Sequence, residues 1–363
     1  MKKKIRVGIL FGGKSTEHEI SLLSAKNIIA ALDRNKYEPV FIGIDKTGQW
    51  LLLDQAKCLL SGGRVTIPKN HTPHVTMSPQ GGGKIDMVNK KPENRIDVIF
   101  PVLHGTFGED GAIQGLLKIA DIPFVGAGIL GSAVGMDKDI TKRLLRDAHI
   151  AVGKFLVYKK YEMGHIAFDT IQKRLGLPFF IKPANQGSSV GVSKIHKQKE
   201  FASAVKKAFT YDTKIMVEEN IRGREIECSV MGNEQPVASL PGEIIPKHEF
   251  YSYDAKYIDP NGAILKIPAD LPKVMIKKIQ RIAVQTYKTL SCEGMARVDF
   301  FLTKDNKIFV NELNTIPGFT QISMYPKLWE ASGVSPTQLI DTLIRLAIDR
   351  FDKEQKLKTS FVG

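Results

Sequence analysis

The stretch GMARVDFFLTKDNKIFVNELNTIPGFTQIS, residues 294–323, contains two apolar segments separated by a short polar one. Residues 297–302 and 308–314 are rich in Val, Ile, Leu and Phe, which favour β-strands. Residues 303–307 between them read TKDNK, a composition typical of a turn. The stretch therefore predicts a β-hairpin.

Four polar side chains are expected on one side of this hairpin. Side chains alternate between the two faces of a strand, so Arg297 shares a face with Asp299, and Glu312 shares a face with Asn314. If the two faces coincide, two carboxylates, an amide oxygen and a guanidinium converge. Three oxygen ligands suit Mg²⁺, and an adjacent arginine would stabilise developing negative charge. The alternative is a surface hairpin with a polar outer face, although carboxylates among residues this apolar are seldom left unpaired.

Composition limits the classes of protein to consider. The chain has 363 residues, enough for two or three domains with proper cores, and no apolar run approaches the length that spans a bilayer. The apolar segment after Met1–Lys4 is too short for a signal-peptide core and is better explained as a first strand. The three cysteines, Cys58, Cys228 and Cys292, are widely spaced, which argues against a disulfide framework and fits a reducing cytoplasm.

The net charge of +14 has two interpretations. It could attract an anionic partner such as a polyphosphate, or it could belong to a lysine-rich soluble surface. The lysines are scattered and not interleaved with aromatic residues, and no nucleic-acid-binding motif occurs. We therefore expect no nucleic-acid partner.

Strands and helices alternate in the first third of the chain, which is typical of a doubly wound parallel sheet. The expected strands span residues 4–10, 40–44, 96–103 and 122–125, and the expected helices span residues 20–33 and 112–120. Two residues beside strand ends have open roles. Glu17 begins a helix, where it could be only a helix-dipole partner or could face a ligand ammonium. His104 could be a capping residue or a ligand contact.

The middle of the chain contains candidate phosphate contacts. A helix is expected from Met136 to about residue 148, and a strand over residues 179–182 precedes the Gly/Ser turn 183–192. That turn could cover a phosphate or simply join two strands. Lys182 favours phosphate, because a lysine at the end of an apolar strand is costly unless it meets an anion.

Two later segments also have alternative interpretations. Glu218–Ile221 follows a short strand and could bind an adenine through its backbone, or it could only connect two domains. Residues 249–257, rich in tyrosine, are either a packed surface loop or a lid over a site. Amphipathic helices are expected over residues 274–290 and 335–349, the second with Ser335 as its N-cap.

Two lysines, a Gly/Ser loop, three oxygen ligands and an arginine are typical of phosphoryl transfer from ATP, although no Walker loop occurs. In these residues the chain resembles the D-alanine–D-alanine ligases of the ATP-grasp superfamily. The resemblance extends over nearly the whole chain. The motifs that carry it are, in order, Gly12-Gly13 with Ser15 and Glu17–Ser21, Leu103–Gly105 with Gly108–Gly111, Met136–Lys138, Lys182-Pro183 with Gly187–Gly191, Tyr253 with Ala255–Tyr257, Arg297–Asp299, and Asn311–Asn314 with Pro317-Gly318.

The resemblance implies an α/β ATP-grasp fold with a doubly wound N-terminal domain (residues 1–127) followed by a central lobe (128–219) and a C-terminal lobe (220–363) that clasp ATP. It also implies a cytoplasmic, homodimeric enzyme of peptidoglycan precursor synthesis that uses D-alanine, ATP and two Mg²⁺ or Mn²⁺, and has no membrane partner. In that reaction ATP converts one D-alanine into an acyl phosphate, which the amine of a second D-alanine attacks. A carboxylate is a poor acyl donor until it is phosphorylated, and the activated group must be kept from water.

The resemblance assigns roles by matching motif. The residues at the reacting groups and the closing lid would be Glu17, Ser188, Tyr257, Arg297, Gly318 and Ser323. Glu17 would bind the first D-alanine ammonium near His104, and Ser323 and Met324 would receive the second D-alanine. Arg297 and the Gly318 backbone would stabilise the oxyanion. The ATP-binding residues would be Lys138, Lys182, Glu218, Glu219, Ile221, Glu225 and Lys256. The two metal ions would be held by Asp299, Glu312 and Asn314.

Three positions depart from common family residues: Glu219 replaces a lysine, Met324 a leucine, and Gln186 a glutamate. Tyr257 matches the lid tyrosine that accompanies dipeptide products, so D-alanine is favoured over D-lactate as second substrate. Two alternatives remain, a D-alanine–D-lactate ligase and a non-catalytic nucleotide-binding protein. The intact metal-ligand set with Arg297 argues against the second.

Overall fold

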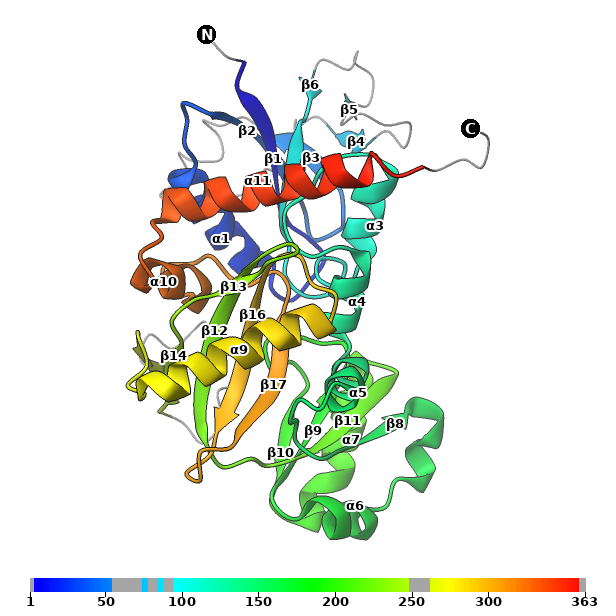
Figure 1. Ribbon diagram of the computed structural model, residues 1–363. Helices are drawn as coiled ribbons and strands as arrows, with labels where there is room; N and C mark the ends of the chain where they lie inside the picture. Colours follow the sequence, from blue (N-terminus) through cyan, green and yellow to red (C-terminus); the bar gives the residue numbers. More distant parts are fainter. Residues whose placement is uncertain (1–2, 54–73, 78–83, 88–93, 248–261, 359–363) are drawn as a thin grey trace.

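The computed structural model describes residues 3–53, 74–77, 84–87, 94–247 and 262–358 (Figure 1). Three sheets position the site, and we call them the N-terminal, central and C-terminal sheets. A small fourth sheet contains β4 (Val75–Met77), β5 (Lys84–Met87) and β6 (Asn94–Arg95). None of the helices in the described ranges is long and apolar enough to cross a membrane.

The N-terminal sheet has the order β3-β2-β1-β7. Its strands are β1 (Ile5–Gly12), β2 (Tyr37–Ile44), β3 (Trp50–Leu53) and β7 (Val98–Val102). β1 pairs in parallel with β2 and β7, and β3 is an antiparallel edge. The prediction of a strand over residues 122–125 is wrong. That segment makes one parallel bridge, from Phe124 to Ile99, and Pro123 offers no backbone donor to extend the pairing.

Helices cover both faces of this sheet, so the doubly wound prediction is confirmed. Side chains of β1 alternate between two cores: Ile9 packs with α1 (His18–Ala31) and α11 (Pro336–Glu354), whereas Leu10 packs with α3 (Ala112–Ile119). The C-terminal helix therefore returns to the N-terminal sheet (Figure 1). α11 begins with the expected Ser335 cap, which forms a capping box with Gln338.

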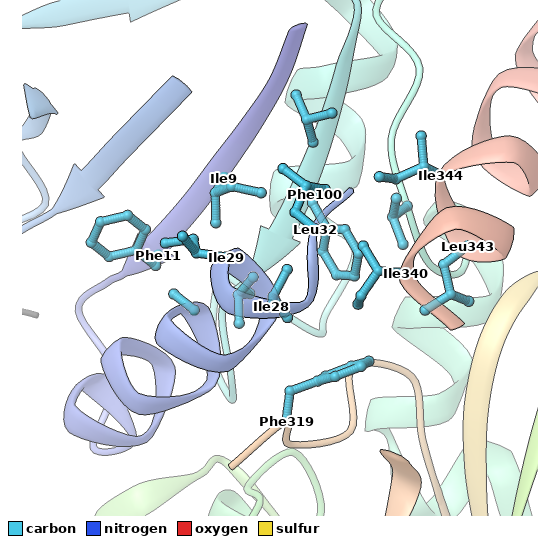
Figure 2. Close-up of a cluster of buried hydrophobic side chains, with 14 of the residues drawn as sticks. Ile9, Phe11, Ile28, Ile29, Leu32, Phe100, Phe319, Ile340, Leu343 and Ile344 are labelled. Carbon is cyan, nitrogen blue, oxygen red and sulfur yellow. The ribbon is translucent and has the colours of Figure 1, made fainter. Parts of the chain in front are cut away.

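A loop from the C-terminal half of the chain enters the same core. Phe319 packs edge-on against Phe100 of β7, with ring centroids 6.1 Å apart and an interplanar angle of 88°. Figure 2 shows Phe319 below a cluster made by Ile9, α1 and the α11 residues Ile340 and Leu343. This aromatic contact fixes the loop on which Gly318 lies.

The central sheet is antiparallel, with the order β10-β9-β11-β8. Its elements are β8 (Phe155–Lys159), η1 (Lys160–His165), α6 (Phe168–Leu175), β9 (Phe179–Pro183), β10 (Ser193–Ile195), η2 (Gln198–Glu200), α7 (Phe201–Tyr211) and β11 (Lys214–Glu219). Before it, α4 (Ile129–Met136) was not expected from the sequence, and α5 (Lys138–Asp147) begins two residues later than predicted. Asp137 caps α5 by accepting the backbone N–H groups of Asp139 and Ile140.

The C-terminal sheet has the order β15-β14-β12-β16-β17, with β13 beside β12. Its strands and helices are β12 (Arg224–Gly232), β13 (Val237–Ala238), β14 (Gly242–Pro246), β15 (Ala263–Lys266), α9 (Lys273–Thr289), β16 (Gly294–Leu302), β17 (Ile308–Asn314) and α10 (Met324–Ala331). The predicted hairpin is thus confirmed as β16–β17. α9 covers one face of the sheet, and its core includes Ile226, Cys228, Val298 and Phe300.

Residues between these apolar ones must face away from α9, towards the site. A β-bulge between Asp299 and Phe300 adjusts the pairing with β17, so that Asp299 lies opposite Glu312 and Phe300 opposite Val310. The extra residue, Asn311, lets Val310 and Leu313 both reach the core while Glu312 remains on the site face. Bulges of this kind commonly re-aim side chains at active sites.

The domain limits proposed from the sequence stay predictions.

Arg350 of α11 is expected to stabilise the fold. Its buried guanidinium donates to the carbonyl oxygens of Phe124 at 2.8 Å and Gly126 at 2.7 Å, and stacks 4.7 Å from the Phe124 ring. Arg350→Met would leave two buried carbonyls unpaired and should lower the free energy of unfolding by about 2–4 kcal/mol. Arg345→Met, on the same helix but 66% exposed, should cost less than about 1 kcal/mol. Denaturant unfolding measures both, and equal losses would contradict the assignment.

Candidate active site

Two adjoining pockets lie where the three sheets meet. The first, here called the carboxylate pocket, is lined on its polar side by Glu17, Glu109, Glu227, Arg297 and Glu312. The second, the lysine pocket, is lined between the central and C-terminal sheets by Lys138, Lys182, Lys194, Glu218 and Glu225, among others. Gly187, Ser188 and Glu312 line both pockets. The two pockets therefore meet at a boundary of serine and carboxylate groups.

The four polar residues of the hairpin converge as predicted. Arg297 lies opposite Asn314, and its Nε and Nη2 each donate to an oxygen of Asp299 at 2.7 Å. Asn314 Nδ2 also donates to Asp299, at 3.1 Å. Burial on its own would lower the pKa of Arg297, but Asp299 and Glu227 outweigh burial and raise it well above its usual value. Arg297 therefore carries a permanent positive charge inside the pocket.

Glu17 joins the N-terminal sheet to the Gly/Ser turn. The Ser188 hydroxyl donates a hydrogen bond to Glu17 Oε1 across 171 residues of sequence. Ser188 and Ser189 have φ angles of 47° and 61°, a left-handed conformation that is uncommon for serine and is often found at functional sites. A side chain at Gly187 would begin 3.1 Å from Glu17. The turn thus approaches Glu17 closely through a residue that lacks a Cβ.

His104 is buried and contacts a different loop from its own. Its Nδ1 lies 3.0 Å from the Ile316 carbonyl oxygen, and its Nε2 lies 3.2 Å from Ser24 Oγ. Burial lowers the pKa of His104, so the imidazole is neutral at physiological pH. The side chain also lines the carboxylate pocket. His104 therefore holds the loop after β17 and faces the site at the same time.

The loop after β17 and the start of α10 close this pocket. Ser323 Oγ accepts the Thr320 N–H at 2.9 Å, and a side chain at Gly318 would begin 2.7 Å from that oxygen. Met324 is buried against Ile244 and Leu328. Gly318, Ser323 and Met324 all line the pocket. The structure therefore brings together the residues assigned to the oxyanion and to the second amino acid.

Charge neutralisation organises the lysine pocket. Glu218 forms ion pairs with Lys182 and with the fully buried Lys142. Burial alone would raise the pKa of Glu218, but these two ammonium groups lower it to about 2. Lys138 Nζ donates to the Gln186 carbonyl oxygen at 2.7 Å and lies 3.9 Å from Glu312. Lys138, Lys182 and Glu218 line this pocket, so its lysines face a space that could hold a polyphosphate.

The residues assigned to adenine and ribose also belong to the lysine pocket. Glu219, Ile221 and Glu225 all line it. The Glu219 carboxylate accepts the Lys154 N–H at 2.7 Å, and its own N–H donates to the Lys154 carbonyl at 3.0 Å. The Glu219 side chain thus braces the neighbouring backbone.

The candidate metal ligands fit a magnesium ion in chemical type. Asp299 and Glu312 are cross-strand partners, and Asn314 adds an amide. In the described part of the chain no three His, Cys, Asp or Glu side chains form a metal-binding group. Two carboxylates and an amide suit Mg²⁺, which is usually bound by one or two carboxylates plus substrate phosphates and water. Lys256 and Tyr257, the two lid residues assigned from the sequence, lie outside the described residues.

Three residues of the site were missed in the sequence. Glu227 alternates with the apolar residues of β12, so its place on the site face could have been inferred from strand periodicity. Lys142 lies one helical turn after Lys138, a spacing that also signals a shared face. Glu109 accepts the N–H of Gly105 and the distant N–H of Ile316, and no local pattern indicates the second contact.

A doubly wound domain followed by two α+β units, with lysines and paired carboxylates between the last two, defines an ATP-grasp enzyme. A family model described as D-ala D-ala ligase N-terminus matches residues 6–127, and one described as D-ala D-ala ligase C-terminus matches residues 144–345. The D-alanine–D-alanine ligase of Oceanobacillus iheyensis is 55% identical over 364 residues, 99% of each chain. The chain belongs to the D-alanine–D-alanine ligase family, which confirms the family and fold predictions.

Solved structures support the same family assignment and fold. The D-alanine–D-alanine ligase from Coxiella burnetii has a TM-score of 0.85 and 43% identity, covering 97% of this chain and 96% of that one. The VanG D-Ala:D-Ser ligase from Enterococcus faecalis has a TM-score of 0.84 and 35% identity, covering 95% of this chain and 100% of that one.

The environment of Glu109 predicts a pH effect on stability. Burial, and then the charge of Glu17, raise the pKa of Glu109 from 4.5 to about 8 despite the two N–H donors. The folded chain therefore binds a proton that the unfolded chain releases, and this contribution to stability is lost as pH rises from 4.5 to about 8. Glu109→Gln mimics the protonated form and should remove that loss.

The melting temperature of Glu109→Gln minus that of the unsubstituted protein should increase between about pH 5 and about pH 8. Glu19→Gln, a matched change at a glutamate that is 67% exposed, should show no comparable trend. A difference for Glu109→Gln that does not change with pH would contradict the buried protonated carboxyl.

Proposed function

We propose that the chain is an ATP-dependent ligase that joins two D-alanine molecules into D-alanyl-D-alanine for peptidoglycan precursor synthesis. A carboxylate oxygen of the first D-alanine attacks the γ-phosphorus of ATP, ADP leaves, and a D-alanyl phosphate forms. The amine nitrogen of the second D-alanine then attacks the acyl carbon, loses a proton, and expels phosphate. Family membership and the names of full-length relatives support this reaction over depsipeptide formation.

The observation that carries this proposal is the boundary between the two pockets. Ser188 and Glu312 line both, so an amino-acid carboxylate in one pocket adjoins a phosphate in the other. Glu17 supplies negative charge for an ammonium, while Lys138 and Lys182 supply positive charge for phosphates. Opposite charges on the two sides thus orient each substrate towards the boundary.

The remaining roles follow from position. Arg297, with its permanent charge, and the backbone of Gly318 stabilise the tetrahedral oxyanion. Ser323 and Met324 receive the second D-alanine, and Glu218, Glu219, Ile221 and Glu225 bind the nucleoside. Asp299, Glu312 and Asn314 would hold two Mg²⁺ or Mn²⁺, which supply neutralisation of phosphate charge. Lys256 and Tyr257, which lie outside the described residues, keep the ATP-binding and lid roles that the family resemblance assigns to them.

We also propose that the enzyme works as a homodimer in the cytoplasm. The cytoplasmic location is supported by its use of ATP, and the dimer by the resemblance to its family. Size-exclusion chromatography with light scattering measures the second point directly. A mass near the 40.3 kDa of one chain would reject the dimer.

Substrate identity is tested by phosphate release with ATP and Mg²⁺. D-alanine alone should support release and give D-alanyl-D-alanine by mass spectrometry. D-lactate or D-serine, each added with D-alanine, should enter the product at less than about a tenth of the D-alanine rate, as expected for a site built around one acceptor. A depsipeptide or D-alanyl-D-serine as main product would keep the chemistry but overturn the assigned acceptor. No phosphate release under any condition would reject the ligase.

The metal ligands have a matched control on the same hairpin. Asp299→Asn removes a carboxylate charge at the metal site with little change in size and should lower turnover at least about a hundredfold. Asp305→Asn makes the same change in the exposed turn and should leave turnover within about twofold. Circular dichroism checks that both variants are folded. Near-normal turnover in folded Asp299→Asn would reject the metal assignment.

A further inference from the structure

Glu227 is a buried carboxylate of the carboxylate pocket that the roles above leave unexplained. It lies on β12 directly opposite Asp299 of β16. Its neighbours Ile226 and Cys228 are fully buried under α9, so strand alternation forces Glu227 onto the site face. Its side chain is 8% exposed, and Oε2 lies 2.9 Å from Arg297 Nε.

Arg297 therefore contacts two carboxylates from neighbouring strands. Asp299 accepts hydrogen bonds from both Nε and Nη2, while Glu227 forms an ion pair with Arg297 through the contact between Oε2 and Nε. Apart from contacting Arg297, the two carboxylates have different roles. Asp299 faces Glu312 across the hairpin and is a proposed metal ligand, whereas Glu227 lines the carboxylate pocket together with Arg297.

A carboxylate that coordinates a cation has fewer lone pairs for a guanidinium and less net attraction for it. If Asp299 alone held Arg297, the arginine would lose orientation when Asp299 turned to the metals. A second, buried carboxylate removes this conflict, because its attraction for Arg297 is strong at low solvent exposure.

We propose that Glu227 is the positioning residue for Arg297, holding the guanidinium towards the oxyanion while Asp299 serves the metal ions. This inference rests on the proposed ligase function. The competing explanation is that Glu227 only stabilises the C-terminal sheet through a buried ion pair, since breaking such a pair is destabilising wherever it occurs. The experiment must separate positioning from stability.

The chain offers a matched control in the same sheet. Glu243 on β14 is a buried carboxylate whose two oxygens each accept from Arg224 of β12 at 2.8 Å, and neither residue lines either pocket. Glu227→Gln should lower kcat by about tenfold to a hundredfold with little change in KM for ATP. Glu243→Gln removes the same group from an arginine and should leave kcat within about twofold, even where both variants lose thermal stability.

A double-mutant cycle tests whether Glu227 acts through Arg297. In an Arg297→Lys background, which keeps the charge but not the fork of donors, Glu227→Gln should change kcat by less than about twofold. The same factor in both backgrounds would show independent roles and overturn the proposal. If Glu227→Gln does not fold, Glu227→Asp keeps the charge on a shorter side chain. It should lower kcat at least about threefold, again only when Arg297 is present.

Metal binding supplies a measurement that does not depend on turnover. In Glu227→Gln the guanidinium retains Asp299 but loses Glu227, so it competes more strongly for Asp299. Electron paramagnetic resonance measures the affinity for Mn²⁺ in the presence of ADP. This affinity should fall severalfold in Glu227→Gln and remain unchanged in Glu243→Gln. Unchanged Mn²⁺ binding in Glu227→Gln would overturn the proposal. If the unsubstituted chain releases no phosphate, the ligase function fails, while the Mn²⁺ titration still reports whether Glu227 and Asp299 share Arg297.

Discussion

Alternation along β12 and β16 is the constraint on which the site depends. One face of the C-terminal sheet must pack beneath α9, and the residues that do so are apolar and fully buried, among them Cys228, Val298 and Phe300. The side chains between them therefore point to the opposite face of the sheet. Glu227, Arg297 and Asp299 are placed there by the packing of their neighbours, before any ligand contributes.

Placing so many charged groups together requires that they neutralise one another. A buried carboxylate or ammonium is tolerated when it is paired. Lys142 and Lys182 hold Glu218 ionised, and Arg297 is held between Asp299 and Glu227. These contacts keep the pockets polar and preorganised, which is the condition for strong electrostatic effects on a reaction inside them.

Local patterns predicted most of the fold and much of the site. The hairpin, its polar face and the doubly wound sheet follow from period-two or helical patterns, and the Gly/Ser turn follows from its composition. Tertiary packing determines the features that local patterns did not predict. The bulge at Asn311 exists because Val310 and Leu313 both fill the core, a requirement invisible within β17 alone. The contact of Glu109 with Ile316 joins residues 207 positions apart, which no local signal can indicate.

The two pockets differ in how firmly their walls are joined. The loop after β17 is tied to the N-terminal sheet by shared core packing of Phe319. It is also tied to α1, because the Phe319 N–H donates to Ser24 Oγ at 3.1 Å and its carbonyl oxygen accepts from Asn27 Nδ2 at 2.8 Å. Described residues of the central sheet instead pack in a hydrophobic cluster of their own, drawn from residues 168–217. That sheet reaches the carboxylate pocket through the polar bond between Ser188 and Glu17. Polar contacts of this kind exchange with water and ligands more readily than core packing does. The carboxylate pocket is therefore anchored to the core of the N-terminal domain, whereas the central-sheet wall of the lysine pocket is held by its own core and by polar contacts, including the ion pair between Glu218 and Lys142.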